Sequence, residues 1–154
     1  DRAWPACAHR EAQEEVGRDV DILSAAVTWH LPRGGPIQQV ELADRPRPWM
    51  LYEMIHPPGT PRAGEVYRIV IYRARLRGRP RELPPDEVLG VIALTGEQVA
   101  RGLAVKLSLA ELLAEGAVLV AAAGELDREV RLYPLGTARA LALLLRQVGA
   151  GRAS

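Results

Sequence analysis

Three glutamates near the start of the chain have a spacing that could bind a cation. Glu11, Glu14 and Glu15 stand at positions i, i+3 and i+4 of an expected helix that Gly17 ends. An α-helix turns by about 100° per residue, so these carboxylates share one face within an arc of roughly 100°. Glu11 and Glu15 repel each other, which costs a bare helix roughly 0.2–0.5 kcal/mol. Three convergent hard oxygen donors therefore predict a site for Mg²⁺ or Mn²⁺.

The rest of the sequence predicts a mixture of helices and strands, and these elements must position the glutamates. Helices are expected at residues 4–16, 96–101, 109–115 and 137–148, with Thr95 and Ser108 as N-caps and Gln98 completing a capping box. Strands are expected at residues 20–29, 37–42, 49–55, 65–76, 88–94, 117–123 and 129–132. The order shows neither regular βαβ alternation nor internal repeats, which favours the α+β class.

Length and composition predict one globular domain. The chain has 154 residues, of which 48% are hydrophobic and 25% charged, and this suits a single domain over residues 1–154 with its own core. Residues 149–154 are expected to form a flexible tail. The acidic segment lies almost at the first residue with no strand before it, so we expect the domain to be incomplete at its N-terminus.

Charge and cysteine content exclude several classes of function. The net charge of +1 gives no argument for nucleic-acid or membrane binding, and no apolar run approaches the roughly 18–20 residues of a transmembrane helix. Cys7 is the only cysteine, so there is no disulfide framework and no cysteine-rich zinc site. With no signal peptide visible, a reduced, cytoplasmic compartment is expected.

Residues 10–17, Arg-Glu-Ala-Gln-Glu-Glu-Val-Gly, resemble the second half of the Nudix box, which reads Arg-Glu-aliphatic-any-Glu-Glu-any-Gly. All five fixed residues of this half are present: Arg10, Glu11, Glu14, Glu15 and Gly17. The resemblance implies a Nudix-like α/β/α sandwich with a mixed sheet, here lacking its N-terminal strands. The order of the later elements is similar to the family, but only the box is specific.

The chain departs from the family pattern at two positions. Arg2 stands where the family has a glutamate eight residues before the motif arginine. Arg18 replaces the usual aliphatic residue after the glycine. In the family the upstream glutamate mainly supports the loop and the motif arginine. The loss of this glutamate therefore bears on loop geometry more than on the metal site.

The resemblance implies Mg²⁺-dependent hydrolysis of a diphosphate bond in a nucleoside diphosphate linked to another moiety. On this basis Glu11 and Glu15 would be the main metal ligands, Glu14 would share ligation, and Arg10 would orient a motif carboxylate. The partner would be a small-molecule nucleoside diphosphate derivative. A homodimer is also allowed, because dimers are common in the family.

Several assignments stay open. In the family the catalytic base is often a carboxylate of a later loop, and Glu87 or Asp86 is our candidate, with Glu82 behind them and Glu11 as an alternative within the motif. Arg68 could contact substrate phosphate or serve as a salt-bridge partner at a sheet edge. The second hypothesis for the whole chain is a Nudix-like nucleotide-binding or regulatory module without appreciable turnover.

Other chemically capable residues are expected to be structural. His9 points away from the carboxylate arc and should be exposed to solvent, whereas Cys7 should be a small buried filler. The alternating arginines between residues 73 and 81 are expected to form a solvated strand face. Contact with phosphate or RNA is the alternative for that stretch.

Overall fold

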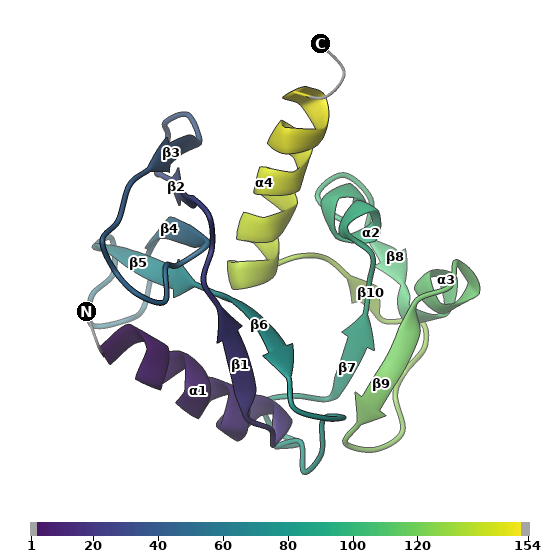
Figure 1. The fold of residues 1–154 in the computed structure, drawn as a ribbon. Helices are drawn as coiled ribbons and strands as arrows, with labels where there is room; N and C mark the ends of the chain where they lie inside the picture. Colours follow the sequence, from purple (N-terminus) through teal and green to yellow (C-terminus); the bar gives the residue numbers. More distant parts are fainter. Residues whose placement is uncertain (1–2, 152–154) are drawn as a thin grey trace. The chain divides into compact units, whose positions relative to one another are not determined.

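The computed structural model describes residues 3–151, and the described chain is α+β as predicted (Figure 1). Its helices are α1 (Ala3–Val16), α2 (Gly96–Arg101), α3 (Leu109–Ala114) and α4 (Gly136–Gly151). Its strands are β1 (Val20–Leu23), β2 (Thr28–Leu31), β3 (Gln38–Val40), β4 (Met50–Ile55), β5 (Val66–Ile71), β6 (Arg73–Leu76), β7 (Gly90–Ala93), β8 (Leu107–Ser108), β9 (Val118–Ala122) and β10 (Arg131–Leu132).

The described residues form two compact units. Unit 1 comprises Ile22–Ala74, and unit 2 comprises residues 3–21 and 75–151. The chain passes from one unit to the other within β1 and β6, which pair with each other. The single domain expected over residues 1–154 stays a prediction.

Unit 1 contains a four-stranded mixed sheet in the order β3-β2-β4-β5. Strands β2 and β4 are parallel, and the other two pairings are antiparallel. Leu31 and Met50 are among the most completely buried side chains of the described residues. Beside them the buried Thr28 hydroxyl donates to the carbonyl of Pro48 at 2.7 Å, which satisfies both groups away from water.

Two of the expected strands are each divided in two, so their predicted lengths are wrong. The segment 20–29 forms β1 and β2, and the segment 65–76 forms β5 and β6. Each break is a change of partner: β1 pairs with β6, whereas β2 and β5 both pair with β4. Between β1 and β2 the main chain of Arg47 is bound instead: its N–H donates to the Ser24 hydroxyl at 2.9 Å, and its carbonyl accepts from the Ala25 N–H at 3.0 Å.

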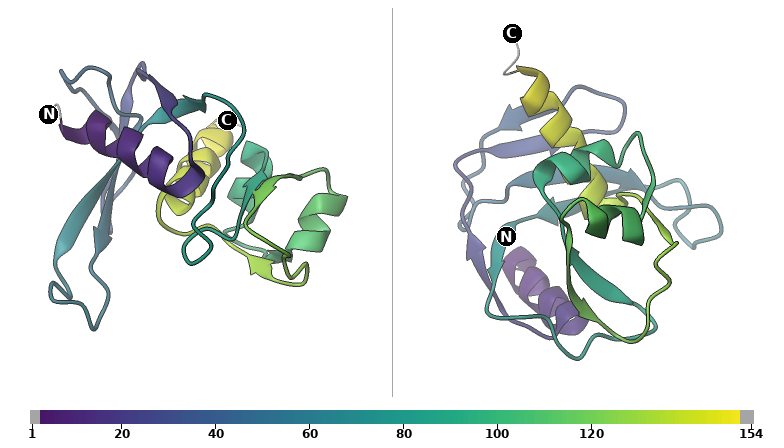
Figure 2. Two further views of the ribbon diagram at one scale, coloured as in Figure 1. Left: turned by 90° about the horizontal axis from the view of Figure 1, so that it is seen from below. Right: turned by 90° about the vertical axis from the view of Figure 1, so that its right-hand side faces the viewer.

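Unit 2 holds all four helices and the antiparallel pairs β7–β9 and β8–β10. Both N-caps are confirmed, and each carries a complete capping box, Thr95 with Gln98 and Ser108 with Glu111. The second box was not predicted. Helix α2 packs against α4 (Figure 2), where a side chain at Gly96 would come within 3.3 Å of Leu145.

The structure tests the predictions for the two ends of the chain only in part. Helix α4 runs to Gly151 and not only to Val148, so residues 149–151 of the expected tail are helical. Residues 152–154 and Arg2 lie outside the described residues. Among the described helices, none is long and apolar enough to cross a membrane.

Candidate functional site

The acidic motif lies on α1, close to its C-terminal end. The helix closes at Gly17, which has the left-handed φ of 62° and donates its N–H to Gln13 at 3.1 Å. This is the usual way in which a glycine ends a helix, and it confirms the predicted stop. The carboxylates of Glu11, Glu14 and Glu15 are all exposed on this helix. The motif is thus presented to solvent on a regular scaffold.

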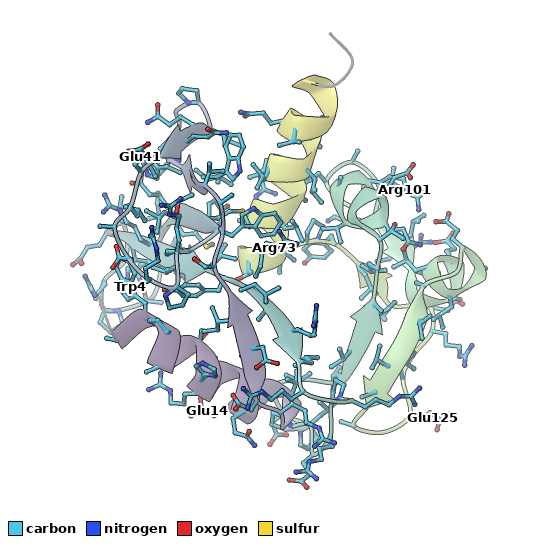
Figure 3. All side chains as sticks on the ribbon, in the orientation of Figure 1. Trp4, Glu14, Glu41, Arg73, Arg101 and Glu125 are labelled. Carbon is cyan, nitrogen blue, oxygen red and sulfur yellow. The ribbon has the colours of Figure 1, made fainter. Side chains whose placement is uncertain are left out.

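Short contacts link four side chains of the motif helix. Arg10 lies 3.7 Å from a carboxylate oxygen of Glu14, and it also donates to the Cys7 sulfur at 3.4 Å. The Cys7 thiol in turn donates to Glu11 at 3.3 Å, and this hydrogen bond raises the pKa of Cys7. The prediction that Cys7 is buried is wrong, because it is only partly covered and bonded within the motif. Figure 3 marks Glu14 on α1.

The donor chemistry of the motif suits a hard divalent cation. Carboxylate oxygens are the ligands that Mg²⁺ and Mn²⁺ prefer. Within residues 3–151, however, no group of three or more His, Cys, Asp or Glu side chains is placed to hold a metal ion. A cation would have to draw the three exposed glutamates together, and their role as metal ligands stays a prediction.

Gly17 is required by a loop that lies against it. We call residues 77–82 the arginine loop. Its Arg81 donates a backbone N–H to the Val16 carbonyl at 3.0 Å, and a Cβ at Gly17 would lie 2.0 Å from the Arg81 carbonyl oxygen. No side chain fits there, so the motif glycine serves both the left-handed turn and the close approach of this loop.

Arg18, which departs from the family pattern, holds the same loop. Its Nε donates to the Arg79 carbonyl at 2.6 Å, 61 residues further along the chain. Its guanidinium also lies 3.6 Å from the place where a Cβ of Gly78 would stand. Because an aliphatic side chain has no donor, it could not make this hydrogen bond.

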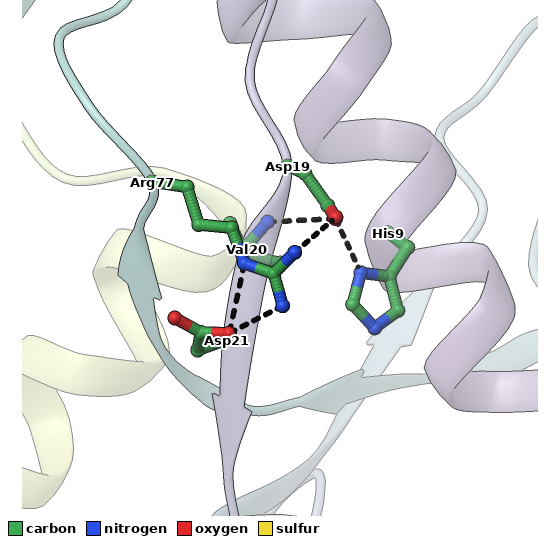
Figure 4. Close-up of polar contacts among 5 residues, drawn as sticks. All are labelled: His9, Asp19, Val20, Asp21 and Arg77. Carbon is green, nitrogen blue, oxygen red and sulfur yellow. Dashed lines mark hydrogen bonds and ion pairs between the residues drawn. The ribbon is translucent and has the colours of Figure 1, made fainter.

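A polar cluster fixes the start of the arginine loop (Figure 4). The Arg77 guanidinium binds Asp21 at 2.6 and 2.9 Å and Asp19 at 3.2 Å. The pKa of Arg77 is raised by its hydrogen bonds to Asp21. His9 lies 2.8 Å from Asp19, and its hydrogen bond, followed by that from the Val20 N–H, lowers the pKa of Asp19. His9 was expected to be exposed to solvent, and its side chain is 43% exposed, but its contact with Asp19 was not predicted.

The candidate base Glu87 lies in the turn before β7, beside the exposed Asp86. Glu87 lines a cavity of about 450 Å³ whose walls are mainly apolar. Asp127 lines the same cavity and is a carboxylate that no motif in the sequence indicated. Glu87 and the three motif glutamates all belong to unit 2. Its role as a base stays a prediction.

Arg68 lies in unit 1, on β5 at the edge of the mixed sheet. It faces Glu53 across the strands, and the two form an ion pair at 3.4 Å. Glu53 also binds His30 at 3.0 Å and the Arg33 N–H at 3.2 Å, and these contacts, led by that with His30, lower the pKa of Glu53. The structure therefore places Arg68 as a salt-bridge partner, and its contact with substrate stays a prediction.

Comparison with known proteins does not assign the chain to a family. No protein-family model, no curated protein and no solved structure matches it. The candidate site therefore depends on the residues themselves and on their arrangement.

Proposed function

We propose that this protein hydrolyses a diphosphate bond in a nucleoside diphosphate linked to another moiety, with Mg²⁺ or Mn²⁺ as cofactor. The observation that carries the proposal is the segment 10–17, whose similarity to the Nudix box extends over five fixed positions. The local structure supports it, because the three glutamates are exposed on one helix and Gly17 makes a contact that only glycine allows. A Nudix-like α/β/α sandwich is the finer fold that belongs to this proposal.

The proposal assigns a role to each residue of the site. Glu11 and Glu15 would hold the cation with help from Glu14, and Arg10 would orient Glu14, to which it is already close. When bound, the cation would neutralise charge on the diphosphate oxygens. Glu87 or Asp86 would accept the proton of the water that attacks phosphorus, while the P–O bond of the anhydride breaks and the second phosphate leaves.

The test is turnover of a panel of nucleoside diphosphate derivatives with Mg²⁺ and with Mn²⁺. Wild-type protein should release a phosphorylated product. Glu15→Gln should lower kcat/KM by more than about 100-fold. Substitution of residues that only hydrogen-bond to a metal ligand already lowers metal affinity or activity by roughly 10–100-fold, and a direct ligand should matter more. The matched control is Glu41→Gln, an exposed glutamate outside the motif that Figure 3 also marks, and it should keep full activity.

Two outcomes would count against a hydrolase. The first is a folded protein with no turnover on the panel with either metal. The second is equal activity of Glu15→Gln and Glu41→Gln. Nucleotide binding without turnover would instead support the second hypothesis, a nucleotide-binding or regulatory module.

A further inference from the structure

The arginines of the arginine loop differ in whether their charge is paired. Arg77 is held by Asp19 and Asp21, so its charge is already balanced. Arg79 and Arg81 are exposed. Among the described residues Arg79 has no side-chain hydrogen bond or ion pair, and Arg81 has only a contact of 3.9 Å with its neighbour Glu82. Two cationic side chains therefore remain available to a ligand.

The backbone beneath these two side chains is fixed. Arg77, Arg79 and Arg81 each have a main-chain group bound by residues 16–19 at 2.6–3.0 Å. Pro80, between the two exposed arginines, is buried. A ligand that bound Arg79 and Arg81 would thus order only the side chains, because the main chain is already in place.

The loop also carries an unusual backbone conformation. Glu82 has a φ of 54°, and it is the one non-glycine residue with positive φ in the described part of the chain. Such strain persists only where the surroundings impose it, and it clusters at functional sites. Here the attachments of Arg77, Arg79 and Arg81 to residues 16–19, together with the buried Leu83, supply that constraint.

The loop ends next to the acidic motif. The carbonyl that accepts the Arg81 N–H belongs to Val16, which directly follows Glu15. The main chain that carries Arg79 and Arg81 is therefore attached to residues 16–18, directly after the segment of α1 that carries the carboxylates. Guanidinium binds phosphate oxygens through paired N–H donors, more specifically than a lysine would.

We propose that Arg79 and Arg81 bind the phosphate oxygens of a diphosphate group at the C-terminal end of α1. The identity of that group as part of the substrate depends on the proposed hydrolase function. Binding of the anion by these arginines does not depend on it.

The test is calorimetry on the full chain, which measures its affinity for inorganic pyrophosphate. The titration is done without divalent metal and at low ionic strength. Arg79→Gln combined with Arg81→Gln should weaken binding by about tenfold or more, given the worth of hydrogen bonds between charged groups. Arg139→Gln, which removes an exposed arginine of α4, is the matched control and should bind as wild type does. Arg79→Lys combined with Arg81→Lys should recover part of the loss.

The outcomes separate this proposal from the hydrolase. If pyrophosphate binds through Arg79 and Arg81 but no substrate is turned over, the anion site stands and the hydrolase fails. If turnover is found but the double variant keeps wild-type pyrophosphate affinity and KM, the anion site is overturned and the hydrolase stands. Equal loss in Arg139→Gln would also overturn the anion site, because binding would then reflect overall charge. Circular dichroism of each variant checks that the main-chain attachments, which the substitutions leave intact, still hold the fold.

Discussion

Replacing Gly17 with alanine should destabilise unit 2 far more than a glycine substitution normally does. The added Cβ would lie 2.0 Å from the Arg81 carbonyl oxygen, whereas an ordinary contact starts at 3.4 Å. The arginine loop must therefore withdraw by about 1 Å or more, which breaks the hydrogen bond from Arg81 to Val16. A left-handed alanine costs about 1–2 kcal/mol, and the lost hydrogen bond adds about 0.5–1.5 kcal/mol.

Gly136→Ala is the matched control for this substitution. Gly136 has a comparable φ of 49°, belongs to the same unit, and has nothing within 4 Å of its Cβ position. It carries the conformational cost of the left-handed region without a collision. Since the alanine also restricts the unfolded chain, which returns about 0.4–1 kcal/mol, Gly136→Ala should cost between about 0 and 1.6 kcal/mol. Gly17→Ala should cost about 0.5–1.5 kcal/mol more than the control from the lost hydrogen bond alone, and the displacement of the loop adds to this difference.

Two measurements check the difference. Urea unfolding followed by circular dichroism gives the loss of unfolding free energy for each variant. Amide hydrogen exchange by NMR reports the loop itself, and the Arg81 amide should exchange faster in Gly17→Ala alone. Equal destabilisation by the two substitutions, or an unchanged Arg81 amide, would show that the loop does not lie against Gly17.

Three further predictions concern other contacts. Ser108→Ala removes the cap of α3 and should lower the free energy of unfolding by about 1 kcal/mol in urea; a loss below about 0.3 kcal/mol would contradict the capping box. Glu53 has a lowered pKa, chiefly through its bond to His30, so the stability it adds is present above its ordinary pKa of 4.5 and is lost as the pH falls through the lower folded value. Glu53→Gln should therefore reduce the loss of unfolding free energy on acidification. If the free energy of unfolding falls below pH 4.5 as steeply in the variant as in the wild type, this role of Glu53 is refuted. Arg18→Leu should speed amide exchange in the arginine loop by about fivefold, from one lost hydrogen bond, while the helicity of α1 stays the same; unchanged exchange would mean that Arg18 does not hold the loop.

The parts of the fold that depend on local chemistry could be predicted. Gly17 marks the end of α1, and Thr95 and Ser108 mark the starts of α2 and α3, because a helix end is decided by residues within one turn of it. The two divided strands could not be predicted. Their alternation of residues continues across a point where the partner strand changes, and a change of partner leaves no signal in one strand alone.

The candidate site shows the same limit. The spacing of the glutamates and of Gly17 was enough to place them on one helix with a defined end. The arginine loop lies about 60 residues away in sequence, so nothing near the motif indicated that Gly17 would face it. One signal was present, since Asp19, just before β1, and Asp21, on β1, alternate as the arginines do on and after β6, which is the pattern of charge pairing across two strands.

The departure at Arg18 does not weaken the case for the acidic motif. An aliphatic residue at this position can support a neighbouring segment only by packing, whereas Arg18 supports it through a hydrogen bond from its charged group to the Arg79 carbonyl. The same loop is attached on either side of that bond, by Arg77 to Asp19 and by Arg81 to Val16. The substitution thus changes how the segment after the motif is held, and it leaves the exposed face that carries Glu11 and Glu15 untouched. Cation binding by this face depends on its carboxylates, and in the described part of the chain the Arg18 guanidinium is directed to Arg79 and Gly78 and forms no hydrogen bond or ion pair with them.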